Sequence, residues 1–225
     1  MRKFSFLATV VLTAICMYAN AVHATTYYLE YSNTLGKVAE GDWYARLDIT
    51  KGNDGLYFTL TANTSIFQPL TKDSGSSLLA WDHFYFNMAE GVGLSANDIK
   101  FTNDNGKWSS TIGANNSVSI FGNFDVGVAG TGNVNGTDPL TFYIANTNLS
   151  VEDFAVSNGK DYMFAAHLKN FEAVKDSFGN IISGESSTWL GHDPPPASSV
   201  PEPATMLLFG AGLAGLGGVL SRRKA

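Results

Sequence analysis

The chain has 225 residues and a formal net charge of −6, which leaves room for one sizeable hydrophobic core. Five of its fourteen Lys and Arg lie near the chain ends, so residues 25–193 hold nine basic and nineteen acidic residues, a net charge of −10. An acidic body argues against DNA, RNA or an anionic membrane surface as its partner, although plain solubility explains the same charge. The single cysteine, Cys16, lies before this region, which therefore forms no disulfide and no thiolate metal site.

The first 24 residues have the layout of a secretory signal peptide. A basic start at residues 2–3 precedes an apolar stretch, 4–15, that is too short for an ordinary membrane span. Small residues at 22–24 suit cleavage by signal peptidase, and 19–21 offer a second option. The chain is therefore expected to be exported.

Alternation of apolar and polar side chains dominates residues 25–193 and predicts β-strands. Apolar residues occupy the odd positions from 43 to 49 and the even positions from 56 to 62, with turn-forming residues at 51–55, which predicts a hairpin. Trp43 is expected to be buried as part of this alternation. Further strands are expected at residues 26–31, 83–87, 118–128, 140–144 and 162–168, with Gly122 at a bulge.

Turn-forming residues separate these strands at 103–106, 130–138 and 157–159. Residues 151–154 are expected to form one helical turn, with Ser150 as its cap. Seven or more short strands favour an all-β fold, namely an antiparallel β-sandwich of jelly-roll or immunoglobulin-like type. Residues 25–193 are interpreted as this body, and parallel sheets with crossover helices are disfavoured.

The composition changes after the body. Residues 194–200 are rich in Pro and Ser and predict an extended linker. Residues 204–220 carry no charge, and as a single transmembrane helix they would be about 25 Å long, slightly shorter than a hydrocarbon core of about 30 Å. Five glycines weaken this helix, so the anchor is marginal and suits a transient hold in the inner membrane.

A basic tail, Arg222, Arg223 and Lys224, ends the chain. Cationic ends of membrane helices stay in the cytoplasm, which would place residues 201–203 at the outer face and the body on the periplasmic side. The N-terminal signal predicts the same topology independently.

Two prolines stiffen the segment before the apolar run. Val200 and Glu202 precede Pro201 and Pro203, so all four residues are expected to be extended. An extended segment just above a membrane suits a protease cleft. Alternatively, Pro203 simply begins the helix, with Glu202 beside its positive end.

The segment 200–203, the glycine-rich apolar run and the basic tail together resemble the PEP-CTERM sorting signal of Gram-negative bacteria. The resemblance covers residues 200–225. It implies recognition by an exosortase, a membrane cysteine transpeptidase that cleaves near the motif and releases the chain or transfers it to the cell surface. Proteins with this signal are associated with exopolysaccharide and biofilm. The resemblance implies nothing direct about the activity of the body.

The body contains no familiar catalytic, nucleotide-binding or metalloprotease motif, so we assign no catalytic residue, no metal and no cofactor. His167 suits either a ligand or base, or a structural histidine bonded to a nearby loop. Asp98, residues 103–105 and residues 53–54 offer oxygen ligands for calcium, but Asn and Asp are also ordinary turn residues.

Aromatic residues make sugar binding an alternative. Trp108 follows a turn and is the better exposed candidate for stacking on a pyranose ring. The leading hypothesis is a non-enzymatic, exosortase-processed envelope or extracellular-matrix protein with a structural or adhesive role linked to exopolysaccharide and biofilm. The alternative is a carbohydrate-binding module for exopolysaccharide.

Overall fold

A computed structural model describes residues 24–70, 79–102, 107–118, 120–130, 138–175, 180–184 and 186–192. The chain forms two units, Met1–Pro194 and Pro195–Ala225, and the described residues belong to the first. Residues 1–23 of the predicted signal peptide, the linker 194–200 and the predicted transmembrane helix 204–220 lie outside the described residues. Within the described ranges, no helix has the length and apolar character needed to cross a membrane.

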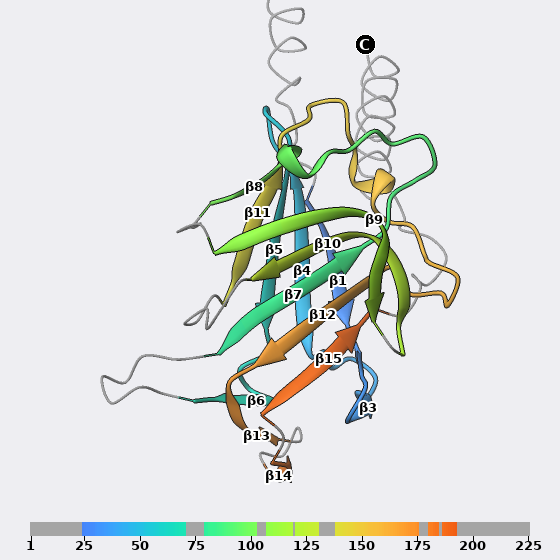
Figure 1. Cartoon of the computed structure of the whole chain (residues 1–225). Helices are drawn as coiled ribbons and strands as arrows, with labels where there is room; N and C mark the ends of the chain where they lie inside the picture. Colours follow the sequence, from blue (N-terminus) through green and yellow to red (C-terminus); the bar gives the residue numbers. More distant parts are fainter. Residues whose placement is uncertain are drawn as a thin grey trace, which may run out of the picture. The chain divides into compact units, whose positions relative to one another are not determined.

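Antiparallel strands make up three sheets (Figure 1). The five-stranded sheet has the order β1 (Ala24–Leu29), β4 (Ala45–Lys51), β5 (Leu56–Ala62), β11 (Leu140–Ile144) and β8 (Ile99–Phe101). The seven-stranded sheet has the order β3 (Gly36–Lys37), β2 (Tyr31–Ser32), β15 (Ser187–Gly191), β12 (Phe164–Lys169), β7 (Ala80–Phe86), β10 (Gly122–Gly130) and β9 (Trp108–Val118). The small sheet has the order β14 (Ile181–Ser183), β13 (Phe171–Lys175) and β6 (Phe67–Pro69).

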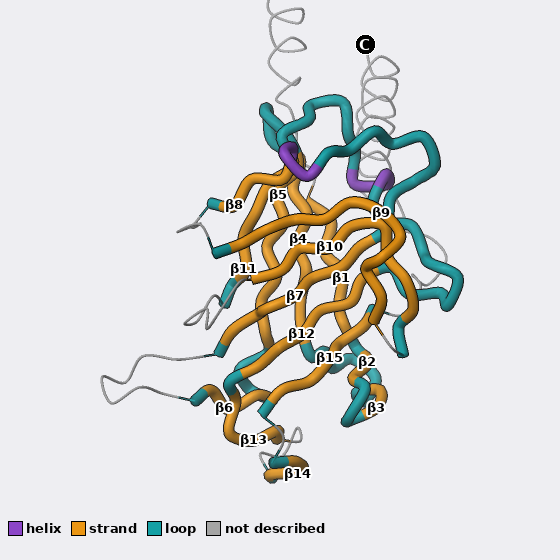
Figure 2. Tube along the Cα trace, in the orientation of Figure 1, coloured by secondary structure: helices purple, strands orange, loops and turns teal. Residues whose placement is uncertain are grey.

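Two short 3-10 helices, η1 (Ala96–Asp98) and η2 (Val151–Asp153), complete the regular structure of the described residues. Both lie at one end of the molecule, and the three-stranded sheet lies at the opposite end (Figure 2). The backbone N–H of Ser150 donates to the Asp153 carboxylate over 2.7 Å, which fixes the start of η2. The predicted helical turn after Ser150 is confirmed.

The two larger sheets pack face to face around one core. Phe58 of β5 stacks on Phe86 of β7 with ring centroids 5.6 Å apart, and Phe84 of β7 lies 5.9 Å from Phe142 of β11. All four rings are fully buried, and burying each one stabilises the fold by about 1.5–3 kcal/mol. The predicted all-β antiparallel sandwich is therefore confirmed.

The predicted hairpin at residues 43–62 is present as β4 and β5. Leu47 pairs with Leu60, and the alternate side chains of both strands are buried, as the sequence pattern predicts. Trp43 is an exception, because the regular strand begins only at Ala45. The Trp43 ring is partly buried and packs against Tyr28 at 5.9 Å, so the expectation of a core position for it was wrong.

The expected single strand at 118–128 is instead the meeting point of two strands, β9 and β10. Val118 pairs with Gly122 across the turn, and Gly122 has φ of 92°, a left-handed conformation that glycine tolerates best. The irregularity in this hairpin lies between Phe124 and Val126, two residues beyond the predicted position. Strand β9 is an edge strand rich in Ser and Asn, so its sequence carries no alternating apolar pattern.

The other predicted strands are present with shifted ends. Residues 26–31 contribute to β1 and β2, 83–87 to β7, 140–144 to β11 and 162–168 to β12. The turn near 157–159 is held by Asn158, whose Oδ1 accepts hydrogen bonds from the backbone N–H groups of Lys160 and Tyr162. Residues 103–106 and 131–137, both expected in turns, lie outside the described residues.

A second, smaller apolar cluster covers part of the outer face of the seven-stranded sheet. It is built around the turn between β9 and β10, where Phe121 and Phe124 are buried together with Val118 and Ala165. Gly191 of β15 lies directly against Phe121, because a Cβ atom at this position would be 2.4 Å from the ring. The group Asp82, His83 and His167 lies on another part of that face.

Candidate functional site

A group of ionisable side chains lies on the outer face of the seven-stranded sheet. His83 of β7 pairs with His167 of β12, whereas the next pair along the two strands is Trp81 with Leu168, so Asp82 is an extra residue in β7. Such a β-bulge re-aims a side chain. Here it puts Asp82 on the same face as His83, while Trp81 enters the main core.

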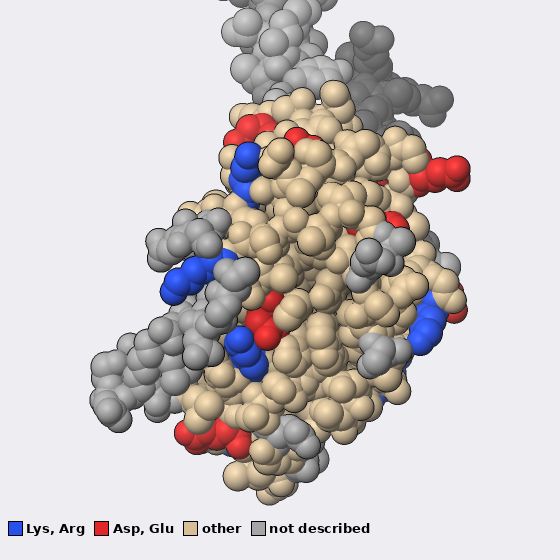
Figure 3. Space-filling view, viewed as in Figure 1, with Lys and Arg blue, Asp and Glu red and all other residues tan. Residues whose placement is uncertain are grey.

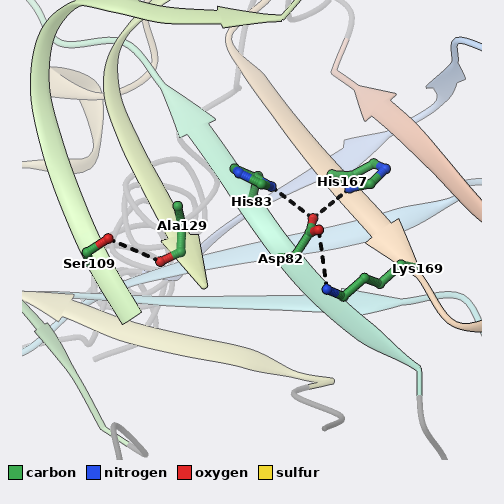
Figure 4. Close-up of polar contacts among 6 residues, drawn as sticks. All are labelled: Asp82, His83, Ser109, Ala129, His167 and Lys169. Carbon is green, nitrogen blue, oxygen red and sulfur yellow. Dashed lines mark hydrogen bonds and ion pairs between the residues drawn. The ribbon is translucent and has the colours of Figure 1, made fainter. Parts of the chain in front are cut away.

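Three donors converge on the Asp82 carboxylate (Figure 4). Nδ1 of His167 lies 2.6 Å and Nδ1 of His83 lies 3.0 Å from Oδ1, and Nζ of Lys169 lies 3.4 Å from Oδ2. The side chain of Asp82 is 15% exposed, that of His167 19% and that of His83 34%. The carboxylate is thus largely covered by its partners, while the imidazole rings remain accessible to solvent.

Two opposing effects act on the pKa of Asp82. Burial raises it, but the hydrogen bonds from His167 and His83 and the charges of these rings outweigh burial and hold the pKa well below its usual range. Asp82 is therefore an anion at neutral pH. Burial raises the pKa of Tyr85, and the negative charge of Asp82 adds to that effect.

Aromatic rings surround the histidines. Trp189 of β15 pairs with His167 across the strands and stacks on it with ring centroids 4.6 Å apart. The Trp189 ring also lies 5.8 Å from both His83 and Tyr85. The backbone N–H of Trp189 donates to Oδ1 of Asn33 over 2.9 Å, which ties β15 to the loop after β2. These contacts hold the imidazole rings in fixed orientations.

The surroundings of the group carry little charge. Figure 3 shows the seven-stranded sheet from its outer side, and most of the described side chains on that face are uncharged. The Lys, Arg, Asp and Glu side chains gather mainly toward the rim of the view. Asp82 and Lys169 are therefore ionised groups in a largely neutral surface, where their interactions are screened less than those of fully exposed pairs.

The geometry brings potential metal ligands together. One ligand atom from each of Asp82, His83 and His167 lies within 4.8 Å of the other two. Two imidazole nitrogens and one carboxylate are donors that zinc, copper and nickel ions accept. The sequence indicated no metal site, because His167 lies far along the chain from Asp82 and His83 and the three residues match no ligand motif.

The predicted glycan contact is in a different environment from the one expected. Trp108 is only 8% exposed and stacks on Phe101 at 5.9 Å, as part of the main core. The expectation that Trp108 is the exposed tryptophan was wrong, because the start of β9 turns this large apolar ring toward the interior. Trp189 is the partly exposed tryptophan on the outer face of the seven-stranded sheet.

The oxygen ligands considered for calcium have local partners in the described residues. The Asp98 carboxylate accepts a hydrogen bond from the backbone N–H of Ser95 over 2.8 Å and so caps η1. The Asp54 carboxylate accepts a hydrogen bond from the Tyr57 hydroxyl over 2.7 Å, within the β4–β5 hairpin. Both carboxylates thus stabilise turns, while residues 103–105 lie outside the described residues.

Sequence reasoning singled out His167 but missed its partners, Asp82 and His83. In a regular strand two consecutive residues point to opposite faces, so alternation separates this pair. A signal was present in the spacing of the apolar residues, because Trp81 and Phe84 are three positions apart instead of two. His167 is bonded to a neighbouring strand and not to a loop as the structural alternative assumed.

The predicted sorting residues lie outside the part of the chain that the structure describes: Val200, Pro201, Glu202, Pro203, Arg222, Arg223 and Lys224. A protein-family model described as the PEP-CTERM protein-sorting motif matches residues 199–224. This match confirms the resemblance. Comparison with curated proteins and with solved structures gave no match.

The fold and the motif together define an exported protein with a β-sandwich body and a C-terminal sorting signal. The chain is an exosortase substrate, and its precursor is anchored in the membrane before cleavage.

Proposed function

We propose that this chain is a non-catalytic structural or adhesive component of the cell envelope or extracellular matrix, linked to exopolysaccharide and biofilm. The observation that carries the proposal is the order of its parts, in which a β-sandwich body is followed by the sorting motif at residues 199–224. In the precursor the body faces the periplasm and the basic tail faces the cytoplasm. Processing by the exosortase then delivers the mature body to the cell surface or the matrix.

The construction of the body supports a long-lived role outside the cell. Residues 25–193 contain no cysteine, so packing alone must stabilise them. The stacked rings of Phe58 and Phe142, with centroids 4.8 Å apart, join neighbouring strands of one sheet and face the phenylalanines of the other. Such a core depends on neither a redox state nor a bound group.

Expression with and without the exosortase tests the sorting step. We expect mass spectrometry to find a chain shortened near residues 200–203 only when the exosortase is present. Glu202→Ala should leave the full tail in place, whereas Glu172→Ala, a change at an exposed acid of β13, should be processed normally. An identical C-terminus in both strains would contradict exosortase processing.

Fractionation of the matrix tests the proposed role. We expect the processed chain to co-sediment with exopolysaccharide and to be released when the polysaccharide is digested. A strain lacking the chain should form a weaker biofilm, and re-expression should restore it. Recovery of all processed protein as free chain in the medium, with normal biofilm in its absence, would contradict the role.

A second candidate function is carbohydrate binding, and the outer face of the seven-stranded sheet favours it. Trp189, Tyr85, Tyr31 and Tyr162 are partly buried there beside the small apolar cluster. Aromatic rings with one apolar face and one polar edge are suited to stack on sugar rings. The partly exposed Trp189 takes the place that the sequence suggested for Trp108.

Binding of the full chain to an array of acidic and neutral polysaccharides tests this candidate. Trp189→Ala should weaken binding. Tyr143→Ala is the control and should bind normally: Tyr143 stacks on Tyr57 at 5.2 Å, but this pair belongs to the five-stranded sheet. Loss of binding only in the Tyr143 variant would move the site to the five-stranded sheet. No binding to any polysaccharide would reject the candidate.

A further inference from the structure

We propose that Asp82, His83 and His167 form a binding site for a divalent transition-metal ion of the zinc, copper and nickel class. This site goes beyond the proposed function, because it depends neither on sorting nor on contact with a polysaccharide. It is argued from the positions of three side chains that two neighbouring strands hold together.

The potential ligand atoms of the three side chains converge. Both imidazole rings direct Nδ1 at the same oxygen, Oδ1 of Asp82, over 2.6 and 3.0 Å (Figure 4). Zinc binds nitrogen and oxygen at about 2.0–2.2 Å, so neighbouring ligands of a tetrahedral ion lie about 3.3 Å apart. The two nitrogen-to-oxygen separations need to open by less than about 1 Å, and the ligand atoms of the two imidazoles already lie within 4.8 Å of each other.

Metal binding would change which protons the two imidazoles carry. In the absence of a metal ion, each imidazole donates an Nδ1 proton to Asp82. When an ion replaces these protons, His83 and His167 each bind it through Nδ1 and carry their one remaining proton on Nε2. The Asp82 carboxylate supplies the single negative charge of the ligand set.

The fold holds the three side chains in place before an ion binds. The bulge in β7 fixes Asp82 beside His83, and stacking of Trp189 at 4.6 Å fixes the ring of His167. The side chains are 15–34% exposed, so an ion can enter and water can complete its coordination. The site therefore has three protein ligands and one coordination position that is open to water.

Lys169 places a positive charge beside the site. Its ammonium group lies 3.4 Å from Oδ2 of Asp82, the oxygen that does not face the imidazoles. It neutralises the carboxylate when no ion is present and repels a divalent ion when one binds. The charge of Lys169 therefore limits the affinity of the site. The two imidazole nitrogens favour transition-metal ions, and calcium or magnesium should bind poorly because they prefer oxygen ligands.

Calorimetry on the full chain in detergent, carrying an affinity tag free of His and Cys, tests the site. We expect one Zn²⁺ or Cu²⁺ per chain, and no saturable binding of Ca²⁺ or Mg²⁺. His83→Asn and His167→Asn should each weaken binding by about tenfold or more, since each removes one of three ligands yet keeps an N–H donor near the position of Nδ1. Asp48→Asn, which removes a carboxylate from the other sheet, should bind as the wild type does.

Two further measurements separate a metal site from a purely structural cluster. Lys169→Met should tighten Zn²⁺ binding by about threefold or more, because a repelling charge is removed. Cu²⁺ should quench the fluorescence of Trp189 through its contact with His167, and Trp189→Phe should lose this component of quenching while it still binds Cu²⁺ in calorimetry. A merely structural hydrogen-bonded cluster produces neither effect.

Two outcomes would overturn the site. One is the absence of saturable Zn²⁺ and Cu²⁺ binding up to about 1 mM, an affinity weaker than about −4 kcal/mol. The other is unchanged binding in the double variant of His83 and His167, which would place the ion elsewhere. If the variants fail to fold, nuclear magnetic resonance of the wild-type imidazoles decides, because bound Zn²⁺ must move both ring protons from Nδ1 to Nε2.

Discussion

The indole Nε1 of Trp81 donates a hydrogen bond of 3.0 Å to Oδ1 of Asp138, and the backbone N–H of Ala62 donates to the same oxygen over 2.9 Å. Trp81 belongs to the seven-stranded sheet and Ala62 to the five-stranded sheet, so one carboxylate oxygen bridges the two layers. Trp81 is fully buried, so its indole N–H has no access to bulk water. Asp138 thus satisfies a polar group inside the core.

Substitution of Asp138 should separate hydrogen bonding from charge. Asp138→Ala leaves two donors without their acceptor, and we expect it to lower the free energy of unfolding by about 1–3 kcal/mol. Asp138→Asn keeps an acceptor oxygen, so its loss should be smaller. Denaturant unfolding followed by tryptophan fluorescence measures both, and equal losses in the two variants would mean that the charge matters more than the acceptor.

Asp138 also predicts a dependence of stability on pH. Burial raises its pKa, and the hydrogen bonds from Ala62 and Trp81 oppose burial only in part. The pKa of Asp138 is therefore higher in the folded than in the unfolded chain, so the folded state binds the proton more tightly. The contribution of Asp138 to the free energy of unfolding falls as the pH rises from below the unfolded pKa to above the folded pKa. Asp138→Asn should lack this decline. The measurement is the free energy of unfolding of the wild type and of Asp138→Asn from pH 4 to pH 7, a range that begins near the ordinary pKa of a carboxyl group. A difference between the two proteins that stays constant with pH would contradict the prediction.

Close packing at Gly191 predicts a sensitive position in β15. A Cβ atom there would lie 2.4 Å from Cε1 of Phe121, so Gly191→Ala forces the small outer cluster to shift. We expect a loss of about 1–3 kcal/mol in stability. Gly184→Ala is the matched control, because a Cβ atom at that position meets nothing within 4 Å. Thermal unfolding of both variants checks the prediction, and similar midpoints would contradict it.

Phe58 predicts that the two large sheets unfold together. Its ring stacks on Phe142 within its own sheet and contacts Phe86 of the opposite sheet, so Phe58→Ala opens a cavity between the layers. We expect a loss of about 3–5 kcal/mol with a single unfolding transition. Circular dichroism and tryptophan fluorescence should report the same midpoint. Two separate transitions would indicate that the sheets do not share one cooperative core.

Strands that bury one face were predictable from the sequence, and strands at a sheet edge were not. The β4–β5 hairpin shows strict alternation of apolar residues, because every second side chain enters the core. Strand β9 pairs on one side only, and Ser and Asn residues such as Ser109 and Asn116 occupy it without an apolar period. Hydrophobic periodicity reflects the burial of side chains, so it does not predict a strand that is held mainly by backbone hydrogen bonds.

The candidate site was less predictable than the fold for a related reason. Asp82 and His83 share one face only because β7 contains an extra residue, and His167 joins them through pairing of strands that are distant in sequence. Trp108 was misplaced because a tryptophan after a turn has no neighbour pattern that reveals which way its ring points. Contacts that depend on strand register across the sheet were therefore beyond the reach of local sequence patterns.

The position of β15 has a consequence for the order of events during export. This strand is the last of the body, yet it inserts between β12 and β2, so the seven-stranded sheet stays split until residues 187–191 arrive. A polypeptide threaded through a translocon with its N-terminus first delivers these residues late. The sorting motif begins at residue 199, eight positions beyond Gly191. Only residues 192–198 separate the strand that completes the sheet from the sorting motif, so a chain exported from its N-terminus would deliver the two in close succession.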